Sequence, residues 1–144
     1  MFKIRKRLLS HLFIRVKDTK LQRHMGEDGF AEDVKEHGLV ELGKGPTISH
    51  GAANHPLVMR RLIEVAEKHK IPLQHEAVSR STSTDADVIY TSRDGVACGL
   101  ISIPLRYMHS PVEMVSLADA RNAAKLAAAF IRSLEKGDTF RLLD

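Results

Sequence analysis

The sequence is constrained most by an almost continuous apolar run, Val96–Ile103, which lies between the turn-forming pair Asp94–Gly95 and Pro104. A strand that is apolar on both faces is typical of a parallel sheet with helices packed on each side. Pro104 is expected to end this strand, because proline has no backbone N–H to donate to a neighbouring strand. The run therefore predicts a central strand of an α/β fold.

Shorter strands and helices are expected on both sides of this run. Asn54–Pro56 favours the start of a helix that ends near Lys70, since proline suits the first helical position. Ser116–Asp119 is a capping box, with Asp in place of the usual Glu, and it opens an alanine-rich helix that ends before Gly137. Strands are also expected at 39–42, 47–49 and 73–78, and a short helix at 84–92. This alternation predicts a three-layer α/β fold, with a largely parallel sheet and flanking helices.

Positive charge is concentrated at the N-terminus. Residues 1–24 contain eight Lys or Arg and one acid, Asp18, and so carry +7, whereas the whole chain carries +4. Residues 25–144 are therefore mildly acidic, which argues against nucleic acid as a partner. The spacing of Phe2, Leu8 and Leu12 fits an amphipathic helix. The favoured interpretation is an ordinary helix or an arm not matched to the domain; a surface-binding helix or a targeting presequence is the alternative.

Simple features of the sequence exclude several classes of protein. The single cysteine, Cys98, rules out an internal disulfide framework and a cysteine-rich zinc site. No apolar run approaches the ~18–20 residues of a membrane span, so no spanning segment is expected. The HExxH, GxSxG and phosphate-loop patterns are absent. The reducing cytoplasm is the expected location.

Two polar loops form the candidate site, because ligands collect at the carboxyl ends of parallel strands. One loop is Ser79–Asp87, and the other is Leu105–Glu113, which contains Arg106, Tyr107 and His109. A loop histidine can bind a metal through its neutral imidazole or move protons, or it can be a hydrogen-bonded surface residue. Spacing alone leaves these roles open.

Five segments carry a resemblance to a known family: Leu42–Pro46, His55–Leu57, Ile71–Gln74, Thr84–Ala86 and Ile101–Glu113. Over residues 39–135 the chain resembles the C-terminal part of the dinuclear-metal aminopeptidases of the glutamyl and deblocking type, often called endoglucanase M or cellulase M. The resemblance implies a partial catalytic domain of a zinc-peptidase-like fold. It divides the chain into a basic segment of unclear origin, 1–24, and part of that catalytic domain, 25–144.

The resemblance implies metal-dependent hydrolysis of the N-terminal peptide bond of a peptide substrate. In the family two divalent ions, usually zinc or cobalt, hold a bridging water, and a glutamate takes the proton of that water. By this resemblance His109 is a metal ligand. Arg106 and Tyr107 are expected to support the loop around His109.

The resemblance also assigns residues outside that loop. Thr84 and Asp85 match a loop that lines the site in the family, and Asp85 is expected to cap its helix and shape the pocket. The family's remaining aspartate ligand lies upstream of Leu42–Pro46, which points to Glu27 or Asp28 at the ligand position.

The rest of the family's active site is missing from this sequence. No Glu-Glu dipeptide occurs, although the family's general base comes from such a pair. The resemblance therefore implies an aminopeptidase that is incomplete or inactive as this chain alone. A complementary chain carrying the missing half, or further copies of this chain, is the expected partner, and an exposed sheet edge predicts self-association and poor solubility. The alternative is a non-catalytic interaction or assembly module that keeps the fold.

Overall fold

The computed structural model describes residues 40–78, 82, 84–92, 95–107, 110–135, 138 and 140, together with the backbone of 12–18. The strands within these residues are β1 (Leu12–Asp18), β2 (Thr47–His50), β3 (Gln74–Ala77), β4 (Gly99–Arg106) and β5 (Met114–Val115). The helices are α2 (Pro56–Lys68), α3 (Ala86–Ile89) and α4 (Leu117–Ser133). No helix in this part of the chain is long and apolar enough to cross a membrane.

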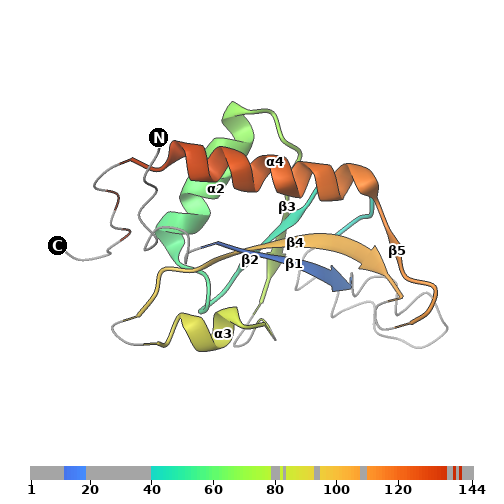
Figure 1. Cartoon of the computed structure of the whole chain (residues 1–144), viewed down its shortest axis with the longest axis horizontal. Coiled ribbons are helices and arrows are strands. Elements are labelled where there is room, and N and C mark those ends of the chain that lie inside the picture. Colours follow the sequence, from blue (N-terminus) through green and yellow to red (C-terminus); the bar gives the residue numbers. More distant parts are fainter. Residues whose placement is uncertain are drawn as a thin grey trace, which may run out of the picture.

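The strands form a single mixed sheet (Figure 1). Its order is β1-β4-β2-β3, and β5 pairs with the end of β4. The outer pairs, β1 with β4 and β2 with β3, are parallel, whereas β4 runs antiparallel to both β2 and β5. The expected α/β class with flanking helices is confirmed, and its sheet combines the two strand directions.

Strand β4 overlaps the apolar run recognised in the sequence but begins at Gly99, three residues later than expected, and it is buried along almost its whole length. The expectation that Pro104 ends it is wrong, because β4 continues to Arg106. On one side β4 pairs with β2 at residues 101–102 and with β5 at 105–106. Pro104 falls between these two partners, where a missing N–H breaks no ladder on that side.

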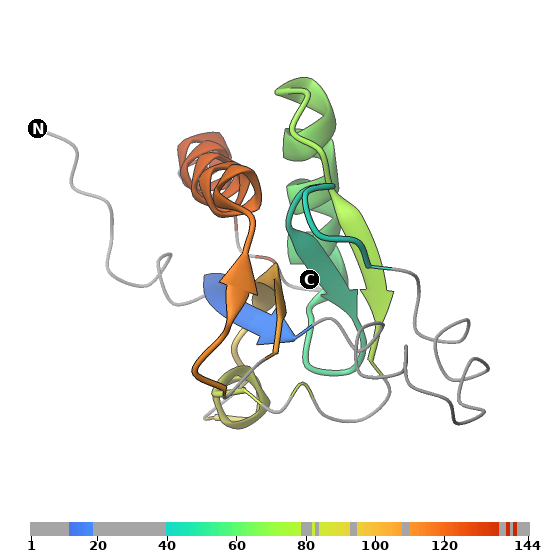
Figure 2. The same cartoon turned by 90° about the vertical axis from the view of Figure 1, so that its right-hand side faces the viewer.

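Helices cover the sheet on both sides (Figure 2). Helices α2 and α4 lie on one face, and α3 lies on the other. Pro56 occupies the first turn of α2 as expected, and the hydroxyl of Ser116 accepts a hydrogen bond from the Asp119 N–H at the start of α4. The core is formed between the sheet and helices α2 and α4. Its fully or nearly fully buried members include Ile48, Val58, Leu62, Ile101, Leu126 and Phe130.

The N-terminal segment departs from the helix expected for it. Leu12–Asp18 is a strand, and its seven residues pair in parallel with Gly99–Leu105 of β4. Apolar Leu12, Ile14 and Val16 alternate along it, which is the period of a strand as well as part of a helical stripe. Pairing with the central strand decides between these two patterns. The strand expected at 39–42 is also wrong within the described residues, because 42–44 form a turn.

That turn is fixed by a buried carboxylate. Asp119, which has no exposed surface, accepts hydrogen bonds from the backbone N–H groups of Gly43 at 2.7 Å and Gly45 at 2.8 Å. Gly45 has a φ of 105°, and a Cβ on it would overlap the backbone carbonyl of Pro72. In a capping box the acidic side chain would accept a hydrogen bond from the backbone N–H of the N-cap residue, Ser116. Here the Asp119 carboxylate binds the distant turn instead.

Candidate active-site edge

The loop that contains His109 begins at one edge of the sheet. Strands β1 and β4 are parallel, and Asp18, the last residue of β1, is in register with Leu105 near the end of β4. The two strands therefore end at the same edge, immediately before the loop. His109, Glu27 and Asp28 lie outside the described residues, and the structure does not test their assignment as ligands.

Tyr107 and Ser110, on either side of residues 108–109, are joined by two hydrogen bonds. The backbone carbonyl of Tyr107 accepts hydrogen bonds from the Ser110 N–H at 3.1 Å and from the Ser110 hydroxyl at 2.6 Å. Tyr107 also has a φ of 60°, which for a non-glycine residue costs about 1–2 kcal/mol. Such strain often marks functional positions. The Tyr107 side chain is exposed, and the half-buried Arg106 has a buried Nε without a hydrogen-bond partner in the described part of the chain.

The loop that contains Thr84 and Asp85 is closed by its own hydrogen bonds. The carboxylate of Asp87 accepts bonds from the N–H and the hydroxyl of Thr82, at 2.9 and 2.8 Å. The Thr84 hydroxyl accepts a bond from the Ala86 N–H at 3.0 Å. Asp85 is exposed and makes no capping bond, so the expectation that it caps α3 is wrong. Its backbone is already helical, with φ −59° and ψ −21°, and Thr84 before it supplies the oxygen instead.

The two candidate loops do not start from one edge of the sheet. Strand β3 is parallel to β2, and β2 is antiparallel to β4, so β3 and β4 end at opposite edges. The segment leading to Thr84 and Asp85 therefore leaves the sheet opposite the loop after Arg106, and α3 lies far from β5 in the view of Figure 1. The expected meeting of these loops required β3 and β4 to run in the same direction, and the antiparallel β2–β4 pairing makes them run in opposite directions.

The described residues do not by themselves make a metal centre. Among them no group of three or more His, Cys, Asp or Glu side chains is placed to hold an ion. His50, the last residue of β2, and His75, the second residue of β3, do approach each other, with Nε2 and Nδ1 2.8 Å apart in an exposed position. Burial and then the charge of His50 lower the pKa of His75. The sequence gives no signal for this pair, because it depends on the register of two strands.

Cys98 has no feature of a nucleophile. It is fully buried ahead of β4, and burial raises the pKa of its thiol. A thiol in such surroundings is protonated and inert.

Comparison with known protein families shows which family this chain is related to. The sequence profile of the M42 glutamyl aminopeptidase family matches residues 24–126, more than half of the chain. The chain belongs to this family. The resemblance drawn from the five sequence segments is thereby confirmed.

Individual relatives extend the comparison. The lysyl aminopeptidase of Pyrococcus furiosus is 43% identical over 111 residues, which are 76% of this chain and 32% of that protein. An aminopeptidase from the archaeon Desulfurococcus kamchatkensis has a similar structure, with a TM-score of 0.69 at 38% identity over 85% of this chain and 34% of that one. The TET1 peptidase of Pyrococcus horikoshii matches with a TM-score of 0.59 at 25% identity, over 89% of this chain and 36% of that one. This chain spans about a third of the length of these relatives.

Proposed function

We propose that this chain supplies the His109 side of the active site of a metal-dependent aminopeptidase, an enzyme that hydrolyses the N-terminal peptide bond of a peptide. The observation that carries the proposal is the family match over residues 24–126. It is supported by the strained backbone of Tyr107 and by the hydrogen bonds that its carbonyl accepts from Ser110, on the other side of residues 108–109. Strain of this kind is retained where the surroundings enforce it, often at ligand sites.

The proposed metal ligand in this chain is His109, and zinc or cobalt is the proposed ion. Imidazole suits both metals. Carboxylate ligands are proposed at Glu27 or Asp28, and the register of β1 adds Asp18 as a further candidate, because it stands opposite Leu105 at the same edge. These residues do not complete a dinuclear centre or provide a general base. We therefore expect the chain to be inactive by itself.

The missing groups are proposed to come from a complementary chain or from further copies of this one. Support comes from a cluster of large apolar side chains exposed at the end of the sheet that carries the His109 loop. Patches of this kind mark interaction sites on soluble proteins. The Pyrococcus horikoshii TET1 peptidase assembles into a tetrahedron or an octahedral shell, which makes an assembly reasonable here too. The exposed side chains are Tyr107, Val112, Met114, Val115 and Leu117.

The test is zinc and cobalt binding by the full chain, measured by isothermal titration calorimetry. We expect one ion to bind, with the affinity lost in His109→Ala and kept in His69→Ala, an exposed histidine at the end of α2. Aminopeptidase activity should be absent before and after metal addition. Equal binding by both variants would contradict the assignment of His109, and activity of the isolated chain would contradict the proposed incompleteness.

A second candidate function is a non-catalytic assembly module in the cytoplasm that keeps the fold. The exposed apolar cluster favours it. A well-folded chain that binds neither metal but associates in sedimentation experiments would support this alternative.

A further inference from the structure

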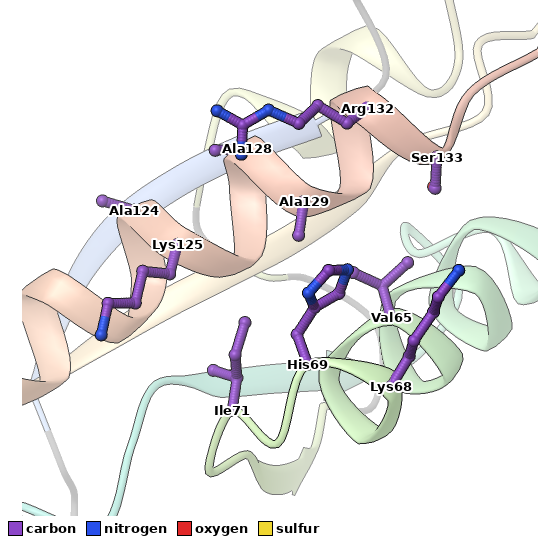
Figure 3. Close-up of a pocket in the computed structure, with 10 residues that line it drawn as sticks. All are labelled: Val65, Lys68, His69, Ile71, Ala124, Lys125, Ala128, Ala129, Arg132 and Ser133. Carbon is purple, nitrogen blue, oxygen red and sulfur yellow. The ribbon is translucent and has the colours of Figure 1, made fainter.

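A groove opens between α2 and α4, on the face of the sheet that these two helices cover (Figure 3). Its volume is about 600 Å³, within the usual range of ligand sites. The apolar lining comes from the last turn of α2, from Ile71 just after it, and from the second half of α4, away from the start of α4 that follows β5. The groove is thus separate from the proposed active-site edge. Its apolar lining residues are Val65, Ile71, Ala124, Ala128 and Ala129.

Small side chains border the groove on the side of α4. Ala124, Ala128 and Ala129 line it there, where larger residues would fill part of the space between the two helices. Helix α2 ends at Lys68, and Lys70 turns the chain away through a left-handed φ of 53°. Small residues in a helix surface allow another helix backbone to approach closely, so the alanines favour a helical occupant.

The rim of the groove is cationic. Lys68 and His69 line one side, Lys125 and Arg132 line the other, and no acidic residue lines it. Lys68 and Arg132 lie in last turns, where a cation offsets the helix dipole. Lys125 lies in the middle of α4 and has no such role.

These cations are not paired with the acids that lie near them in the sequence, Glu64 and Glu135. Within the described residues none of the three Lys and Arg side chains of the rim forms an ion pair or a hydrogen bond. Arg61 of α2 provides the contrast, since it pairs with Glu64 at 3.8 Å and with Asp138 at 3.3 Å. The rim of the groove therefore carries basic side chains that form no ion pair with the described part of the chain.

We propose that this groove docks an acidic amphipathic helix of a partner polypeptide. The apolar side chains of the helix lie on the alanine floor, and its carboxylates meet the rim, in the manner of helix-in-groove recognition. The cations favour a polypeptide over a small anion because they are spread along the groove. Lys125 and Arg132 are seven residues apart on α4, about 10 Å along its axis. Acids about two turns apart on the partner match this spacing.

The probe is a fluorescein-labelled helical peptide of about 16 residues, with leucines on one face and glutamates beside them. Its binding to the full chain is followed by fluorescence anisotropy. We expect saturable binding that weakens when salt rises from about 50 to 300 mM, because exposed charges are screened. A peptide with lysine at every glutamate position should not bind.

Three variants locate the site. The double change Lys125→Glu with Arg132→Glu should weaken binding at least about tenfold, because it reverses the charge of one side of the rim. Ala128→Phe should weaken it by a similar factor by filling the floor. Arg121→Glu is the matched control, since Arg121 is an exposed cation of α4 outside the groove, and binding should be unchanged. Circular dichroism checks that each variant is folded.

Three outcomes would overturn the proposal. The first is equal binding by Arg121→Glu and the rim variant. The second is binding of phosphate or laurate, with the same sensitivity to the variants, while the peptide does not bind. The third is a shift of the free chain from oligomer to monomer in Ala128→Phe without any effect on peptide binding, which would assign the groove to a second copy.

Discussion

Residues 42–46 form a turn that is held by the carboxylate of Asp119. Removal of this carboxylate should lower the stability of the fold more than any other single change that affects the turn. This carboxylate is fully buried and accepts two backbone hydrogen bonds, from Gly43 and Gly45, across more than seventy residues of sequence. It joins α4 to the turn that leads into β2. Without it the turn loses both long-range bonds at once.

The size of the effect follows from the type of bond. A hydrogen bond to a charged group contributes about 1.5–3 kcal/mol, so two such bonds contribute roughly 3–6 kcal/mol. A domain of this size is stable by only about 5–15 kcal/mol in total. Asp119→Ala is therefore expected to lower the free energy of unfolding by several kcal/mol, at or near the limit of stability.

Urea denaturation of the full chain, followed by circular dichroism, measures this loss. Ser116→Ala is the control on the same helix, because it removes one local cap bond that is worth about 1 kcal/mol. Asp119→Asn keeps a single acceptor oxygen and should fall between the two, which gives a measurable variant if Asp119→Ala is unfolded. A loss in Asp119→Ala no larger than that in Ser116→Ala would refute the role assigned to the carboxylate.

Three further changes have defined outcomes. Gly45→Ala should cost more than Gly43→Ala in urea denaturation, because both glycines have positive φ but a Cβ clashes only at Gly45. Stability should fall as pH drops below about 6.5, the ordinary pKa of histidine, since the folded chain lowers the pKa of His75 and the unfolded chain takes up the proton first. This dependence should flatten in His75→Gln, and an unchanged slope would show that the titration of His75 does not cause it. Cys98 should react with a thiol reagent slowly in the native chain and fully in denaturant, because burial raises its pKa; a fast native reaction would contradict its burial.

The sequence predicts the elements whose signals are local. Helix α2 begins as expected because Pro56 suits the first turn, and α4 begins as expected because the Ser116 hydroxyl accepts the bond of an N-cap. The buried strand β4 is recognised from its composition alone. Its true end is not, because whether Pro104 breaks a ladder depends on which neighbours pair beside it.

Strand direction is what the sequence could not give. No local sequence pattern shows that β2 and β3 run in the direction opposite to β4. Two loops of similar composition were therefore expected at one edge, although they leave from opposite edges. The Asp119 contact was missed for the same reason, since its partners are long-range and its local pattern fits a capping box.

The register of β1 changes how the basic N-terminal segment relates to the proposed site. Seven consecutive residues pair with the central strand, so Leu12–Asp18 is part of the sheet. Parallel pairing also places the end of β1 beside the end of β4, from which the chain enters the loop with His109. Asp18 is therefore the first carboxylate to test as a metal ligand beside His109, because its register with Leu105 is set by the sheet. The proposal of Glu27 or Asp28 rests on sequence likeness alone. If Asp18→Asn left metal binding by the full chain unchanged while His109→Ala abolished it, Asp18 would be excluded and Glu27 or Asp28 would remain the proposed ligands.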